Sequence, residues 1–217
     1  INSPHNPSGT ILSKWDMLQL EAILKPTNII VLSDEVYEHI IFDDHTHESA
    51  SRFPDLALRS FVCASFGKTF HVTGWKIGYC VAPAALMAEF RKVHQFAVFC
   101  VDHPVQRALA TYLKNPSHYL ELNNFYQKKR EFFLNGIKSS KFKFKPTQGT
   151  YFQLLDYTNI SMEKDVVIGK RLITDNGLAS IPISSFNVDN RNDYMLRFCF
   201  AKKEETLEQA VEILCSL

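Results

Sequence analysis

Residues 61–80, FVCASFGKTFHVTGWKIGYC, carry the strongest indication of the fold of this chain. Apolar runs at 61–64 and 77–82 are short and bounded by small residues, which predicts two buried strands. Lys68 and Lys76 lie between these runs. A lysine beside buried strands loses hydration, so we expect a lowered pKa and a reactive amine at Lys68. The alternative is a loop lysine that points at water, which charge statistics favour for a lone lysine.

Residues 28–34, NIIVLSD, carry a second chemical feature. The β-branched run at 28–32 is typical of a central strand in a parallel sheet. Acids at the carboxyl end of such a strand lie where open α/β sheets bind ligands, so Asp34 is a candidate binding carboxylate. Alternatively, Ser33 or Asp34 caps a following helix.

Hydrophobic periodicity predicts strands that alternate with helices, as in an α/β protein. Expected helices cover 13–24 (with Ser13 as N-cap), 83–100, 105–113, 119–135, 163–174 and 204–217. Expected strands cover 28–32, 61–64, 77–82, 179–183 and 194–200, with two more within 141–155. The Asn-Pro-Ser segment at 115–117 predicts a boundary between domains at 1–114 and 115–217.

Bulk composition excludes several classes of function. The 217 residues carry a net charge of +1, whereas nucleic-acid binding requires a concentrated basic face. Residues 141–145, KFKFK, predict a half-buried strand with its phenylalanines inside and its lysines outside. No run approaches the length of a membrane span. The five scattered cysteines favour free thiols in a reducing compartment, so we expect a cytoplasmic protein.

Residues 43–48, DDHTHE, combine acids with two histidines and could suggest a metal site. Zinc sites usually pair such ligands with a second cluster at a defined spacing. No second cluster is evident in the sequence, so we expect a solvated surface loop and no bound metal.

Four segments, in order, resemble a known family: NSPHNPSG at 2–9, SDEVY at 33–37, SFGKTFHVTGWKIG at 65–78 and MLRFCFAK at 195–202. Together they resemble the class I aminotransferases of fold type I, most closely the subgroup with kynurenine, glutamine and bacterial methionine aminotransferases. The resemblance implies part of a large α/β domain with a mostly parallel sheet, followed by a smaller carboxyl-terminal α/β domain.

The resemblance implies pyridoxal 5'-phosphate (PLP) as the cofactor and six residues that bind it, the five that follow here and Asn6. Lys68 would bind PLP covalently and move protons during the reaction. Ser65 and Lys76 would hold the phosphate, one by its hydroxyl and one by its charge. Asp34 would keep the pyridine nitrogen protonated. Tyr37, on the same face of an expected helix, would donate to the ring oxygen.

Two further residues are implied at the substrate. Asn6 would bind the ring oxygen of PLP and help to hold the substrate carboxylate, although Asn6 before Pro7 is also an ordinary turn residue. Arg197 lies inside an apolar strand and needs an anion, and the substrate carboxylate fits its planar donors. The alternative for Arg197 is an internal ion pair with Asp193 or Asp189.

The implied reaction is the transfer of an amino group from an amino acid of the methionine, glutamine or aromatic type to a 2-oxo acid, by a homodimer. Methionine is the first expectation. A PLP-dependent carbon–sulfur β-lyase shares the same residues and is an alternative. A third possibility is an inactive fragment, because in this family a long segment precedes the first motif. The chain therefore resembles the carboxyl-terminal half of an aminotransferase.

Overall fold

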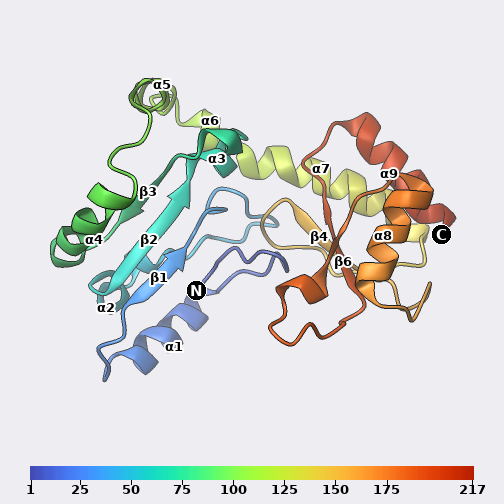
Figure 1. The fold of residues 1–217 in the computed structure, drawn as a ribbon, viewed down its shortest axis with the longest axis horizontal. Coiled ribbons are helices and arrows are strands. Elements are labelled where there is room, and N and C mark those ends of the chain that lie inside the picture. The colour runs from blue at the N-terminus through green and yellow to red at the C-terminus, as the bar shows by residue number, and fades with distance from the viewer. The chain divides into compact units, whose positions relative to one another are not determined.

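The computed structural model describes residues 1–217 and forms two compact units (Figure 1). Unit 1 consists of Ile1–Pro4 and Ile11–Asn123, and unit 2 of His5–Thr10 and Asn124–Leu217. The division falls at the start of a long helix, later than the expected boundary at 114. The assignment of 1–114 and 115–217 to a large and a small domain stays a prediction.

Unit 1 contains a three-stranded sheet in the order β1-β2-β3, formed by Val31–Asp34, Ser60–Ser65 and Gly78–Val81. Strands β1 and β2 are parallel, and β3 runs antiparallel to β2. The helices of this unit are α1 (Lys14–Leu24), α2 (Pro54–Ala57), α3 (Phe66–Thr69), α4 (Ala84–Ala97), α5 (His103–Tyr112) and α6 (Ser117–Leu120).

One face of the unit 1 sheet is buried against α1 and α2. The core residues there are Met17, Leu24, Val31, Ala50, Phe53, Leu56 and Val62. Helix α1 begins where the sequence predicts, because Ser13 and Asp16 form a capping box in which each side chain bonds the backbone N–H of the other. On the opposite face of the sheet the Leu32 side chain is 67% exposed.

The strand expected at 28–32 is shifted along the chain in the structure. Strand β1 begins at Val31, and Ile29 and Ile30 are exposed outside it. On the side of β1 away from β2, residues 1–3 run alongside it through a parallel bridge between Asn2 and Asp34. The apolar run therefore predicted a strand correctly, but not the residue at which it begins.

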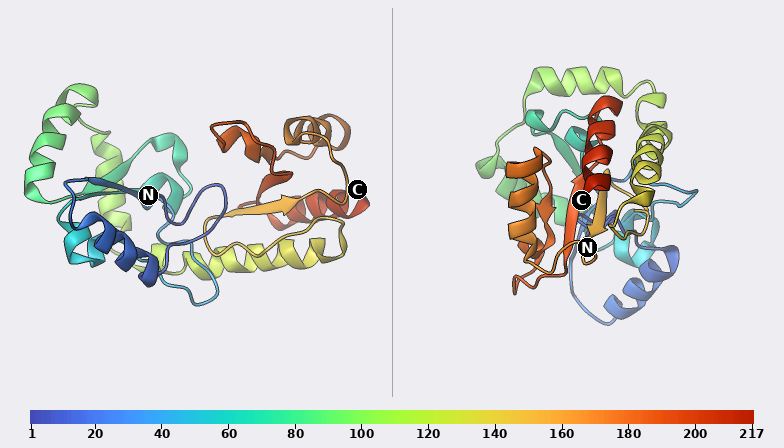
Figure 2. Two further views of the ribbon diagram at one scale, coloured as in Figure 1. Left: turned by 90° about the horizontal axis from the view of Figure 1, so that it is seen from below. Right: turned by 90° about the vertical axis from the view of Figure 1, so that its right-hand side faces the viewer.

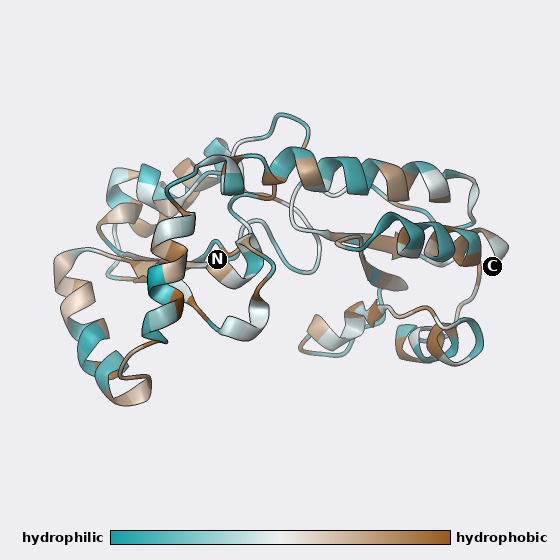
Figure 3. Ribbon diagram, turned by 90° about the horizontal axis from the view of Figure 1, so that it is seen from above, coloured by the Kyte–Doolittle hydropathy of each residue, from teal (hydrophilic) through white to brown (hydrophobic).

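Unit 2 contains an antiparallel sheet in the order β4-β6-β5, formed by Phe152–Asp156, Met195–Cys199 and Ile181–Pro182. Its helices are α7 (Leu122–Gly136, which begins in unit 1), α8 (Asp165–Asn176) and α9 (Glu204–Ser216). Figure 2 shows α8 on one side of this sheet and α7 with α9 on the other. Hydrophilic and hydrophobic residues alternate along α7 (Figure 3). One of its hydrophobic residues, Phe133, is buried.

Local signals in unit 2 agree with the predictions. Gly177 ends α8 in the left-handed conformation, with φ of 67°. In the KFKFK segment, Phe142 is buried and its neighbouring lysines are exposed. However, only Lys143 pairs there, in one isolated bridge to Asp156, so this segment is not a full strand.

Candidate functional site

Strand register brings Asp34 and Ser65 to the same face of the unit 1 sheet. Asp34 at the end of β1 is the partner of Cys63 on the parallel strand β2. Ser65 lies two residues beyond Cys63, and side chains two apart on a strand share a face. This is the more exposed face, since the partners Ser33 and Val62 are buried on the other one. The Asp34 carboxylate and the Ser65 hydroxyl therefore lie at the carboxyl ends of adjacent parallel strands.

Ser65, Lys68 and Lys76 line one cavity of about 330 Å³, which we call the lysine cavity. Its other lining residues are Ala64, Gly67, Thr73, Ile77 and Gly78. Lys68 is half-buried on α3, the short helix that follows β2 directly, and Lys76 is exposed. The Ser65 hydroxyl does not cap α3. No acidic side chain lines this cavity, so two ammonium groups and a hydroxyl surround a space that suits an anion.

Backbone conformation and two glycines shape this cavity. Lys76 has φ of 53° and ψ of 42°, the left-handed region that non-glycine residues seldom adopt. At Gly67, a Cβ atom would lie 3.1 Å from the Cα of Thr73. At Gly78, it would lie only 2.4 Å from the carbonyl oxygen of Ala64. The close approach of β3 to β2 at the cavity therefore requires a residue without a side chain at Gly78.

The segment after β1 is a turn, which corrects the expected helix. Residues 36–39 form this turn, and Tyr37 within it is 3% exposed. The Asp34 Oδ1 atom accepts a bond from the Val36 N–H at 3.3 Å. Asp34 therefore accepts a local backbone bond at the start of a tight turn, and it caps no helix, contrary to the alternative interpretation.

Glu35, the second acid after the strand, for which the sequence predicted no separate role, is the buried anchor of this turn. Its side chain accepts hydrogen bonds from Ser33 Oγ (2.7 Å) and the Ala50 N–H (3.0 Å), and pairs with His47 Nε2 (2.7 Å). Burial raises the pKa of Glu35, but the bonds from His47, Ser33 and Ala50 outweigh burial and leave the pKa below its ordinary value. His47 belongs to the 43–48 segment, so this expected surface loop is exposed only over 43–46.

The remaining predicted residues, Asn6 and Arg197, meet within unit 2. The Arg197 Nη1 atom donates a hydrogen bond to the Asn6 Oδ1 atom. The guanidinium lies over the Phe152 ring, 3.9 Å from its centroid, and 5.3 Å from the centroid of Phe186. Arg197 is opposite Leu154 on β4, so the pleat brings Phe152, two residues away, to the same face. Two aromatic rings and an amide therefore orient this guanidinium.

The alternative hypothesis paired Arg197 with Asp193 or Asp189. In the structure these two acids contact Arg191. Arg191 Nε donates to Asp193 Oδ1 at 2.8 Å, and the Arg191 N–H donates to Asp189 Oδ1 at 3.1 Å. Phe152 and Phe186 were missed by the sequence reasoning. Alternation along β4 could have identified Phe152, whereas Phe186 lies in a short 3-10 turn without periodicity.

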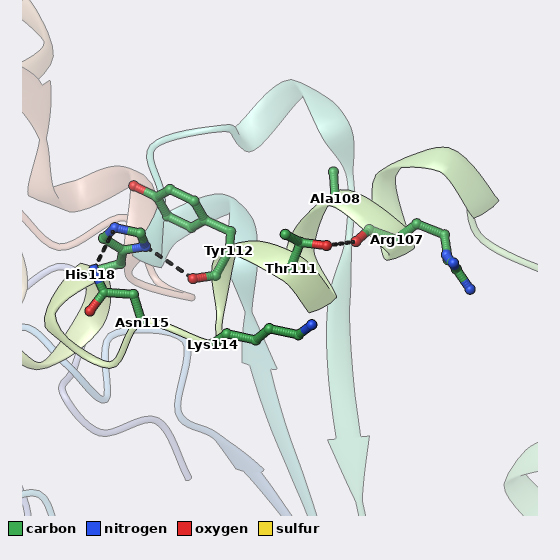
Figure 4. A pocket seen from close by; sticks show the side chains of 7 residues that line it. All are labelled: Arg107, Ala108, Thr111, Tyr112, Lys114, Asn115 and His118. Carbon is green, nitrogen blue, oxygen red and sulfur yellow. Dashed lines mark hydrogen bonds between the residues drawn. The ribbon is translucent and has the colours of Figure 1, made fainter.

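A larger hollow of about 710 Å³ lies elsewhere on unit 1 (Figure 4). It is lined by Arg107, Ala108, Thr111, Tyr112, Lys114, Asn115 and His118. Within it the Tyr112 and His118 rings are stacked with centroids 3.8 Å apart. None of the predicted site residues lines this hollow, so its size does not make it the candidate site. The lysine cavity is smaller but collects the reactive side chains.

Fold and site together describe an α/β protein that can hold an anionic ligand beside a lysine amine. Residues 1–214 match the model of the family Aminotransferase class I and II, so the chain belongs to this aminotransferase family.

Relatives and solved structures agree with the family. The chain is 46% identical to the methionine aminotransferase of Escherichia coli K12, covering 100% of this chain and 56% of the relative. It is 32% identical to the kynurenine–oxoglutarate transaminase of Dictyostelium discoideum, covering 100% and 55%. The crystal structure of an E. coli methionine aminotransferase superimposes with a TM-score of 0.97 at 46% identity, over 100% of this chain and 57% of that one.

The N-succinyldiaminopimelate aminotransferase structure from Mycobacterium tuberculosis gives a TM-score of 0.93 at 33% identity, over 100% of this chain and 57% of that one. The chain thus spans little more than half the length of the relatives that it matches. None of its helices combines the length and apolar character needed to cross a bilayer.

Proposed function

We propose that the chain provides the cofactor-lysine and carboxylate-binding parts of a PLP-dependent aminotransferase. The observation that carries this proposal is the lysine cavity, where Ser65, Lys68 and Lys76 converge next to the sheet face of Asp34. The family match supports the same reaction.

The residues of the lysine cavity fit PLP by their chemistry. A phosphate requires cations and hydroxyl donors, and Ser65 and Lys76 supply both without a competing carboxylate in the lining. The aldehyde requires an amine, which Lys68 supplies. The pyridine nitrogen requires an anion, and the Asp34 carboxylate lies on the exposed sheet face of the adjacent strand. When bound, PLP supplies an electron sink for the substrate α-carbon.

Each residue of the chain then has a defined task. Ser65 and Lys76 would bind the phosphate, and Asp34 would hold a proton at the ring nitrogen. Tyr37 would donate a hydrogen bond to the ring oxygen. Lys68 would supply the amine that holds the aldehyde, and the same amine would move the proton at the substrate α-carbon.

In unit 2, Arg197 and Asn6 orient the substrate. The planar guanidinium binds the α-carboxylate through two parallel donors, and the Asn6 amide supports it. Contacts with Phe152 and Phe186 fix the plane of the guanidinium and reduce its hydration, which strengthens its attraction for a carboxylate. A fixed carboxylate orients the α-hydrogen for transfer.

Methionine is the amino donor that we propose first, with glutamine and aromatic amino acids as related donors and a 2-oxo acid as acceptor. Similarity to the methionine and kynurenine enzymes supports this choice. We further propose that the protein acts as a homodimer in the cytoplasm, consistent with its scattered free cysteines.

A spectroscopic experiment tests this proposal. Purified protein is mixed with PLP, reduced with borohydride and digested. We expect a visible absorbance band that borohydride removes, and a mass increase confined to the peptide with Lys68. With methionine and a 2-oxo acid, the keto acid of methionine should accumulate. Absence of the band and of labelled Lys68 would contradict the proposal. Release of ammonia and pyruvate from a cysteine conjugate without any 2-oxo acid would favour the β-lyase instead.

A further inference from the structure

Two cysteine side chains meet across the unit 1 sheet. Cys63 on β2 and Cys80 on β3 stand directly opposite each other in the antiparallel register. The Cys63 thiol donates to the Cys80 sulfur, with 3.8 Å between the two Sγ atoms. All five cysteines of the chain are free thiols, and only in this pair do the Sγ atoms contact each other. Proximity therefore distinguishes this pair from the other three cysteines.

The backbone at this pair already meets the requirements of a disulfide. Directly opposed residues of antiparallel strands have Cα atoms about 4.5–5.5 Å apart, and disulfides accept about 4.4–6.8 Å. Only side-chain rotation is needed to bring the sulfurs from 3.8 Å to bonding distance. We propose that Cys63 and Cys80 form a modification site at which a peroxide converts two thiols into a reversible cross-strand disulfide.

Both thiols of the pair are partly buried, which affects their reactivity. Burial, together with the Cys80 contact and the nearby charges of Asp34 and Glu35, raises the pKa of Cys63 to about 11. A protonated thiol reacts slowly with a peroxide, so we expect the disulfide to form faster as the pH rises.

The reaction balances without any further reagent. One of the two sulfurs takes one oxygen from the peroxide, becomes a sulfenic acid, and releases one water in the case of hydrogen peroxide. The second sulfur then attacks the first, which forms the S–S bond and expels the hydroxyl as a second water with the proton of the second thiol. Two thiols lose two electrons, and the peroxide gains them.

This modification site adjoins the lysine cavity. Ser65 and Gly78, which line that cavity, are the register pair two residues further along the same strands. A bond between Cys63 and Cys80 would also enclose both Lys68 and Lys76 in one covalent loop. The disulfide would therefore link β2 covalently to β3 two residues from the cavity. It would limit how far residues 64–79 can move apart.

Peptide mapping tests the proposal. Trypsin cleaves after Arg59, Lys68, Lys76 and Arg91, so the two cysteines fall on separate peptides, 60–68 and 77–91. After treatment of the native protein with one equivalent of hydrogen peroxide, we expect these peptides to be joined with the loss of two hydrogen atoms. Dithiothreitol should separate them again.

Variants examine whether the pair is specific. Cys100→Ser, which removes a different cysteine, should leave the joined peptides unchanged. Cys63→Ser and Cys80→Ser should each abolish the joined peptides. The proposal is overturned if peptides 60–68 and 77–91 remain separate in the native protein, or if Cys100→Ser also prevents them from joining.

Discussion

Buried Glu35 pairs with partly buried His47, whose Nε2 atom lies 2.7 Å from the Glu35 carboxylate. The contact joins the turn after β1 to the 43–48 loop, from residues twelve positions apart. Asp34 precedes Glu35 at the end of β1 and Tyr37 lies in the turn, so this pair stabilises the backbone that presents both of them.

The first prediction concerns the pH dependence of stability. The folded pKa of Glu35 is below its ordinary value of 4.5. Its carboxylate therefore stabilises the fold fully above the unfolded pKa, and this contribution is lost as pH falls through the lower folded pKa. Glu35→Gln should reduce the free energy of unfolding by about 1.5–3 kcal/mol at neutral pH. In urea titrations the difference from wild type should shrink on acidification.

Glu48→Gln is the matched control for this prediction, because Glu48 lies in the same loop and pairs with the exposed side chain of Arg52. That exposed pair should contribute at most about 1 kcal/mol. Equal losses for the two variants would contradict the anchoring role of Glu35.

The second prediction concerns Lys68. Lys68→Ala should lower the transamination rate by at least roughly 10³-fold, since both the covalent attachment and the proton transfer need its amine. PLP should still bind noncovalently through the remaining phosphate contacts, so borohydride should no longer fix it to the protein. Lys92→Ala removes a lysine from an exposed pair with Glu89 and should leave both readouts unchanged. Near-normal turnover by Lys68→Ala would refute the assignment.

The third prediction concerns substrate binding by Arg197. Arg197→Lys keeps the charge but loses the planar pair of donors, so KM for the amino acid should rise about tenfold or more while kcat changes less. The same change at Arg191, which binds Asp193 at the surface, is the control and should leave KM unaltered. An unchanged KM in Arg197→Lys would show that another group binds the carboxylate.

The fourth prediction compares two glycines in the lysine segment. A Cβ at Gly78 would lie 2.4 Å from the Ala64 carbonyl oxygen, whereas a Cβ at Gly74 would meet nothing within 4 Å. Gly78→Ala should therefore destabilise the fold by about 1–3 kcal/mol, as overpacking does. Gly74→Ala should be neutral or slightly stabilising. Similar urea midpoints for the two variants would contradict the close approach of β3 to β2.

Local chemistry made much of the fold predictable. The capping box at Ser13 and the left-handed Gly177 are short-range signals, and the helices that they delimit were predicted within a residue or two. The cavity residues were also predictable, because the two lysines and Ser65 lie within one segment between two strands. Their roles with PLP stay predictions.

Long-range contacts explain what the sequence did not reveal. Loop 5–10 belongs to unit 2 because Gly9 accepts backbone bonds from Gln148 and Gly149, a pairing that no local pattern encodes. Glu35 looked like an ordinary acid of a turn, because its partner His47 lies in another loop. Strand β1 started later than expected, because an apolar run alone does not fix the residue at which pairing begins.

Position 76 has a conformation that glycine would adopt more easily. Holding a lysine there costs about 1–2 kcal/mol relative to glycine, so the fold is less stable than it could be. Backbone strain of this kind is found where the side chain has a function. Lys76→Gly should therefore raise the free energy of unfolding and at the same time weaken phosphate binding. At this residue, folding stability and phosphate affinity oppose each other.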